Sequence, residues 1–119
     1  MKKYTLYILL DKMLNKGQRI AQAAHVGVEI ARDLSLPLGH WDSMRDSNES
    51  VAPFEDWMHD PKVVCLVADA AEIADKTRQC RESGYWVSDF ADGDFMTMTY
   101  AIGPVPRENE YEFAGWRLA

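Results

Sequence analysis

Apolar and β-branched residues gather in four short runs, which predict four β-strands at residues 4–10, 62–68, 85–90 and 96–102. The first two runs are almost continuously apolar, which is typical of strands buried on both faces. A helical pattern follows each of these two runs. The order strand, helix, irregular segment, strand, helix, strand, strand therefore predicts an α/β domain in which helices cover a mixed sheet.

Residues with capping and turn chemistry mark the ends of these elements. Asn15 is a candidate N-cap for a helix that runs to about residue 34, and Asp69 is one for a helix over residues 70–83. Gly84 is the expected C′ residue of the second helix. Asp-Gly-Asp at residues 92–94 predicts the turn between the last two strands, and Gly-Pro at residues 103–104 is expected to end the final strand.

The segment from residue 35 to residue 61 has the weakest pattern. It contains three prolines and scattered acidic residues, which favour irregular structure. It also carries Trp41, Phe54 and Trp57, so we expect parts of it to pack as short helical pieces. The tail with Phe113 and Trp116 is also too aromatic to lie free in solvent.

The first helix has two contrasting stripes. Its apolar stripe, predicted to face the core, consists of Ile20, Ala24, Val28 and Ala31. A separate polar stripe consists of Gln18, Gln22, His25, Glu29 and Arg32. The pattern leaves two interpretations of the polar stripe open: a solvated helix face, or the wall of a site that begins at the helix N-terminus, where backbone N–H groups favour anions.

Composition narrows the class of protein. A chain of 119 residues fits a single domain over residues 1–119. The net charge of −6 argues against binding phosphates over the whole surface, but the neighbouring Lys12, Lys16 and Arg19 form a candidate basic patch. Two cysteines without a CxxC spacing argue against a metal site or a disulfide framework. With no apparent signal peptide or membrane span, the cytoplasm is the expected location.

Two motifs resemble the type 2 peptidyl-tRNA hydrolases. The pattern Asp11, then Lys-Gly-Gln at residues 16–18, then Ala-Gln-Ala-Ala-His at residues 21–25 is similar to the family's first motif. That motif has an Asp, then Lys-Gly-Lys, then a helix with Ala-Gln-x-x-His. Tyr-Ala-Ile-Gly-Pro at residues 100–104 resembles the Ala-Ile-Gly-Pro ending of its last strand. The resemblance is closest to the divergent peptidyl-tRNA hydrolase domain-containing branch.

The resemblance implies a fold and an activity. The implied fold is a single three-layer domain with a four-stranded mixed β-sheet between helices. The implied activity is hydrolysis of the ester that joins a peptide, or an N-blocked amino acid, to tRNA, without a metal or an organic cofactor. The family's tendency to dimerise also predicts a homodimer. The catalytic groups are expected where the first helix begins, beside the loop that precedes the last strand.

The resemblance assigns candidate roles to eight residues. The candidate catalytic residues are Gln18, Gln22, His25 and Asp92. Lys16 and Arg19 are the expected contacts to tRNA phosphates, and Thr97 and Thr99 are the candidate substrate-binding hydroxyls. Structural interpretations stand beside these roles. His25 and Gln22 would be structural groups on a helix, Asp92 a turn residue, and the two threonines ordinary β-branched strand residues.

Several departures from the family pattern support a second hypothesis. Gln18 stands where the second lysine of Lys-Gly-Lys would be, which removes a charge. The family's Asp-x-Gly-Arg-Thr loop keeps only the acid, as Asp92, and the expected threonine of the last strand falls on Met98, between Thr97 and Thr99. The chain is therefore either a hydrolase with a remodelled site or a binding module that keeps the fold without the activity.

Overall fold

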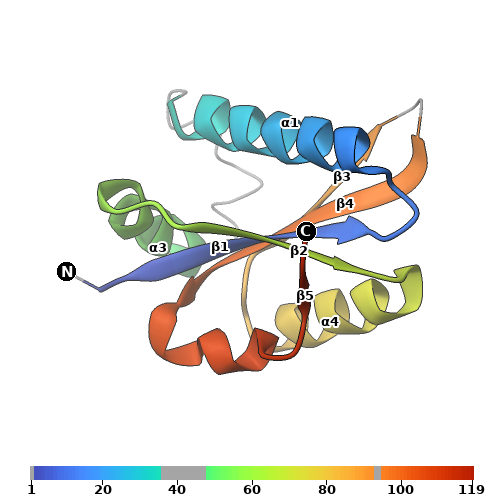
Figure 1. The fold of residues 1–119 in the computed structure, drawn as a ribbon. Helices are drawn as coiled ribbons and strands as arrows, with labels where there is room; N and C mark the ends of the chain where they lie inside the picture. The colour runs from blue at the N-terminus through green and yellow to red at the C-terminus, as the bar shows by residue number, and fades with distance from the viewer. Residues whose placement is uncertain (1, 36–47, 93–94) are drawn as a thin grey trace.

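Five strands form one mixed sheet in the order β3-β4-β1-β2-β5 (Figure 1). The computed structural model describes residues 2–35, 48–92 and 95–119. The strands are β1 (Tyr4–Asp11), β2 (Val63–Ala68), β3 (Val87–Asp92), β4 (Phe95–Pro106) and β5 (Arg117–Leu118). Strands β1 and β2 are parallel, and every other neighbouring pair is antiparallel. The expected α/β architecture with a mixed sheet is confirmed, with one more strand than the four expected.

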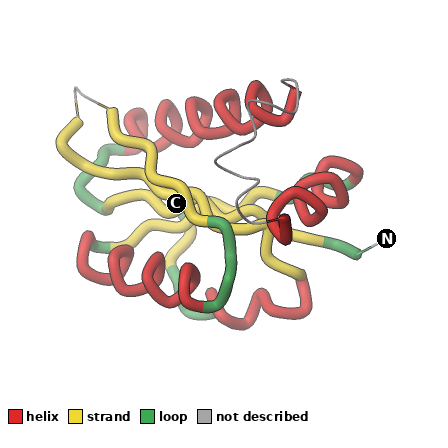
Figure 2. The backbone as a smooth tube through the Cα atoms, turned by 180° about the vertical axis from the view of Figure 1, so that it is seen from behind, coloured by secondary structure: helices red, strands yellow, loops and turns green. Residues whose placement is uncertain are grey.

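Helices cover both faces of this sheet. They are α1 (Lys16–Ser35), α3 (Asn48–His59), α4 (Ala70–Glu82) and the 3-10 helix η2 (Arg107–Phe113). Helices α1 and α3 lie on one face, and α4 and η2 lie on the other (Figures 1 and 2). Asp69 caps α4 by accepting a hydrogen bond from the Glu72 N–H, and Gly84 follows the helix with a φ of 87°. Both predicted caps of this helix are confirmed.

Strand β1 is the centre of the core because its side chains serve both faces. Leu6, Ile8 and Leu10 pack toward α1 and α3, whereas Tyr7 and Leu9 pack toward α4 and η2. All five are buried. This two-sided burial explains why the run from residue 4 to residue 10 is continuously apolar instead of alternating with polar residues.

Three boundaries differ from the predictions. Gly103 and Pro104 do not end the last strand, because β4 continues to Pro106. Instead, the register of β4 against β1 shifts at this point. Gly103 adopts a φ of 125° there and donates its N–H to the Trp86 carbonyl.

The aromatic tail supplies β5, which pairs with β2. Residues 48–59 form one helix of 12 residues, α3, so the helical packing expected around Phe54 and Trp57 is confirmed, over a longer piece than expected. Residues 36–47 lie outside the described part of the chain.

The orientation predicted for α1 is wrong. Ile20 and Val28 are 63% and 68% exposed, and Ala24 is exposed as well. The buried face contains Val26, Ile30 and Gln22 instead. Both sides of the helix carry apolar residues at helical spacing, so the apolar pattern alone does not choose between them. The Ala31 side chain lies outside the described residues.

Alanine substitutions on the two sides of α1 test this orientation. Ile30→Ala removes a buried side chain, so we expect it to lower the free energy of unfolding by about 2–5 kcal/mol. Ile20→Ala trims an exposed side chain on the same helix and is expected to change it by no more than about 0.5 kcal/mol. Urea unfolding followed by circular dichroism measures both. A larger loss from Ile20→Ala than from Ile30→Ala would contradict the observed orientation.

None of the helices in the described ranges is long and apolar enough to cross a membrane.

Candidate functional site

Several of the residues that the sequence singled out lie at or near one edge of the sheet. Because β1 and β2 are parallel neighbours, their carboxyl ends meet at this edge, and α1 and α4 begin beside it (Figure 1). The hairpin of β3 and β4 reaches the same edge, since Thr99 pairs with Leu10 and the strand begins further out, at Phe95. In α/β sheets, ligands commonly bind outside the carboxyl ends of the strands. We call this region the carboxyl edge.

The start of α1 is fixed by a reciprocal capping box. The Gln18 N–H donates to the Asn15 Oδ1 at 2.9 Å, and the Asn15 N–H donates to the Gln18 Oε1 at 2.9 Å. Asn15 therefore caps the helix as predicted. Gln18 orders the helix start at the position where the resemblance implied a catalytic lysine, so its side-chain oxygen already has a structural partner.

Gln22 and Thr99 meet between the helix and the sheet. The Thr99 hydroxyl donates to the Gln22 Oε1 at 3.2 Å, and the two side chains are 0% and 3% exposed. Thr99 lies on the face of β4 that carries Ala101, which belongs to the α1 side of the core. Of the two threonines expected near this site, Thr99 is thus the one shown to reach the helix. The Thr97 and Asp92 side chains lie outside the described residues, although Asp92 ends β3 at the carboxyl edge.

His25 lies away from this contact. Its Nε2 is 3.2 Å from the Glu29 Oε1, and its side chain is 56% exposed. Its imidazole therefore has a carboxylate partner on the solvent side of α1. The structure brings Gln22 and Thr99 together at one contact and leaves His25 outside it.

A valine at position 99 tests what the buried pair contributes. Thr99→Val keeps the shape of the side chain but removes the donor to the buried Gln22 amide, so we expect a loss of about 1–3 kcal/mol in the free energy of unfolding. Thr99→Ser keeps the hydroxyl and is the matched control for the hydrogen bond. Guanidinium denaturation measures both variants. A Thr99→Val variant as stable as the wild type would show that this hydrogen bond does not contribute to the free energy of unfolding.

The carboxyl edge also carries four cations that form no ion pair within the described residues, next to the carboxylates of Asp69 and Glu72. Elsewhere, several cations are paired with acids: Lys2 with Glu108, Lys3 and Arg107 with Asp60, Lys62 with Glu110, and Arg78 with Asp75, whereas Lys76 and Arg81 form no ion pair within the described residues. Within the described residues, no ion pair holds the side chains of Lys12, Lys16, Arg19 or Arg117. The Arg19 guanidinium donates to the Lys12 carbonyl at 3.2 Å, and its buried Nε has no partner.

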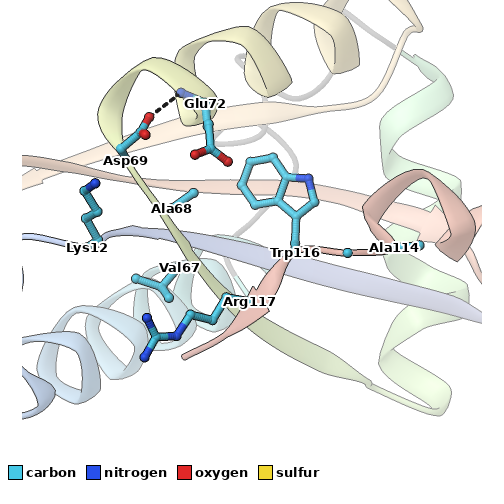
Figure 3. A pocket seen from close by; sticks show the side chains of 9 residues that line it. Lys12, Val67, Ala68, Asp69, Glu72, Ala114, Trp116 and Arg117 are labelled. Carbon is cyan, nitrogen blue, oxygen red and sulfur yellow. Dashed lines mark hydrogen bonds between the residues drawn. The ribbon is translucent and has the colours of Figure 1, made fainter.

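Two cavities open at this edge. One, of about 500 Å³, lies beside α1 and is lined by Lys16, Arg19 and apolar residues that include Ile20. The other, of about 430 Å³, lies at the start of α4. Its charged and aromatic lining consists of Lys12, Asp69, Glu72, Trp116 and Arg117 (Figure 3). Both volumes fall in the range of small-molecule sites.

Two carboxylates in the second cavity influence each other. The hydrogen bond from the Glu72 backbone N–H to Asp69, at 2.8 Å, lowers the pKa of Asp69. The contact with the Asp69 side chain raises the pKa of Glu72, and Lys12 opposes that increase through its positive charge. Within the described ranges, no group of three or more His, Cys, Asp or Glu side chains is placed to hold a metal ion.

Trp116 and Arg117 are the site residues that the sequence interpretation missed. The aromatic tail was expected to pack, but nothing in its pattern indicated that it would add a strand next to β2. That pairing brings Trp116 and Arg117 to Lys12 and Glu72, which are far away in the sequence. The aromatic and basic character of the tail was the available signal.

No protein-family model matches this chain, and a search of curated proteins found no match.

Proposed function

We propose that this chain is a peptidyl-tRNA hydrolase-like protein of the type 2 fold, which binds the acceptor end of tRNA at the carboxyl edge and hydrolyses the ester to the peptide there. The resemblance in the two motifs supports the proposal. The fold adds that Thr99, from a distant part of the sequence, contacts Gln22 in the first turns of α1, the helix that begins at Lys16. Such a substrate is formed during translation, so the function implies a cytoplasmic location.

The observation that carries the proposal is the charge at the carboxyl edge. The chain has a net charge of −6, yet four cations lie at one edge and form no ion pair within the described residues, although Asp69 and Glu72 lie near Lys12: Lys12, Lys16, Arg19 and Arg117. Local clusters of this kind attract phosphates even on an acidic protein. The first backbone N–H groups of α1 add a partial positive charge at the same place. The cations beside the start of α1, Lys16 and Arg19, therefore support the proposal that a polyanion binds at this edge.

The proposed reaction needs only water as the second substrate. Water attacks the ester carbonyl carbon and gives up a proton, the carbonyl oxygen becomes an oxyanion, and the ribose oxygen then leaves with a proton. Asp92, at the end of β3, is the proposed base that accepts the proton from water. The backbone N–H groups at the start of α1 are the proposed stabilisers of the oxyanion, while Lys16 and Arg19 hold tRNA phosphates.

Two contacts favour the second hypothesis, a binding module without hydrolase activity. Gln22 and Thr99 are buried against each other, so neither is exposed to an incoming ester. His25 is paired with Glu29 on the solvent side of the helix. A protein of this kind would bind tRNA through the same cations but leave the ester intact.

Release of the N-acetyl-amino acid from N-acetyl-aminoacyl-tRNA under single-turnover conditions tests the proposal. We expect hydrolysis by the wild type and a rate about 10²–10⁴-fold lower for Asp92→Asn. The matched control is Asp75→Asn, which removes the same charge from the exposed side of α4 and should keep the wild-type rate. Wild-type protein that binds tRNA without releasing the amino acid would be a binding module. Protein that neither binds tRNA nor releases the amino acid would refute the proposal.

A further inference from the structure

The cavity at the start of α4 combines three kinds of group around one space. Lys12 and Arg117 supply positive charge, Trp116 supplies an aromatic surface, and Asp69 and Glu72 supply carboxylates. Figure 3 shows Lys12 and Trp116 on opposite sides of Ala68, with Asp69 and Glu72 above it and Arg117 below it. The lining comes from the end of β1, from the continuous stretch that ends β2 and starts α4, and from the C-terminal tail, so the fold assembles it from three separate segments.

The cations in this cavity are available to a ligand. Lys12 is anchored through its backbone, whose N–H donates to the Ala68 carbonyl at 2.9 Å, while its side chain is exposed. Arg117 is held by the pairing of β5 with Val67 of β2, and its side chain is also exposed. No carboxylate in the described ranges forms an ion pair with either side chain. An anionic ligand would therefore not have to displace an internal ion pair.

The Trp116 side chain also keeps part of its surface open to a ligand. The Trp116 indole is only half-buried, and its N–H has no acceptor among the described residues. Its backbone is fixed by a hydrogen bond from its N–H to the Phe113 carbonyl, at 3.3 Å, and Gly115 turns the chain before it with a φ of 87°. A half-exposed indole held in a fixed position can stack on a nucleobase.

We propose that this cavity binds a nucleoside monophosphate unit, with the base against Trp116 and the phosphate between Lys12 and Arg117. The Glu72 carboxylate accepts hydrogen bonds from the ribose hydroxyls and repels the phosphate toward the two cations. The volume of about 430 Å³ suits a ligand of this size. The unit belongs either to a free nucleotide or to the 3′ end of an RNA. In the second case, the inference rests on the proposed function.

Binding of AMP, adenosine, inorganic phosphate and the trinucleotide CpCpA, measured by titration calorimetry, tests the proposal. AMP is expected to bind more tightly than adenosine or phosphate, because each of those lacks one half of the recognised unit. Trp116→Leu, Lys12→Gln and Arg117→Gln should each weaken AMP binding at least fivefold. Arg78→Gln, an exposed arginine on α4 that is paired with Asp75, is the control that should leave binding unchanged.

The outcomes separate this inference from the proposed function. CpCpA binding tighter than AMP assigns the cavity to an RNA end, whereas equal or weaker binding assigns it to a free nucleotide. No binding of AMP or CpCpA up to millimolar concentration, or AMP affinity that survives all three substitutions, would overturn the inference. In that case, hydrolysis of N-acetyl-aminoacyl-tRNA by the wild type would still support the proposed function. Conversely, Trp116-dependent AMP binding without hydrolysis would leave the cavity as a nucleotide site and refute the enzyme.

Discussion

Phe54→Ala is expected to lower the free energy of unfolding by about 3–5 kcal/mol, because it empties a completely buried aromatic site. The Phe54 ring packs edge-on against Trp57 and Trp86, with centroid distances of 6.2 and 5.2 Å. Phe54 therefore connects α3 to Trp86, the residue that precedes β3. A domain of this size has a total stability of about 5–15 kcal/mol, so the loss would leave a marginal fold.

Thermal and urea unfolding, followed by near-ultraviolet circular dichroism of the tryptophans, measure this effect. Met58→Ala is the matched control, since Met58 lies on the same helix and is 51% exposed. It is expected to change stability by no more than about 0.5 kcal/mol. Equal stability of the two variants would mean that α3 is not part of the core.

Removing the charges of Lys16 and Arg19 together is expected to weaken tRNA binding about tenfold or more at roughly 0.15 M salt. Both side chains line the cavity beside the start of α1. If each side chain contacts one phosphate, the negative slope of log affinity against log salt concentration should become shallower by about 0.7–0.9 for each charge removed. Filter binding of tRNA at several salt concentrations, with the Lys16→Gln, Arg19→Gln double variant, gives both quantities.

The control for that double variant is Arg78→Gln with Arg81→Gln, which removes the same net charge from α4. Both arginines are exposed, and neither lines the two cavities at the carboxyl edge. An equal loss of affinity in this control would show that tRNA responds to net charge alone. An unchanged circular dichroism spectrum is required of both double variants, because the Arg19 guanidinium also donates to the Lys12 carbonyl.

Local patterns predicted the elements whose determinants are close in the sequence. The continuous apolar runs predicted β1 and β2 correctly because strands that are buried on both faces are apolar at consecutive positions. An amphipathic helix has spaced apolar positions instead. Asn15 and Asp69 were recognised as N-caps because a cap bonds to a residue three positions away. The resemblance then placed the expected site at the start of α1, where the structure finds Lys16 and the capping box.

Contacts between distant residues account for what the sequence left unpredicted. The buried face of α1 includes Gln22 because Thr99, 77 positions away, satisfies its amide, and no helical pattern contains that information. Strand β5 has only two residues, too few to show a period. Its position beside β2 decides where Trp116 and Arg117 lie. The roles of Asp92 and Thr97, and the homodimer implied by the resemblance, stay predictions.

The most direct measurement is a titration of the ¹⁵N-labelled chain with an unlabelled RNA hairpin that carries a tRNA acceptor stem, followed by NMR. The largest amide shifts are predicted at the carboxyl edge, at residue 12, at residues 16–19 and at the ends of β2 and β3. Shifts that gather instead around α3 and Asp60, at the opposite end of the sheet, would contradict the assignment of this edge to tRNA. A titration without shifts at roughly 0.15 M salt would contradict tRNA binding itself.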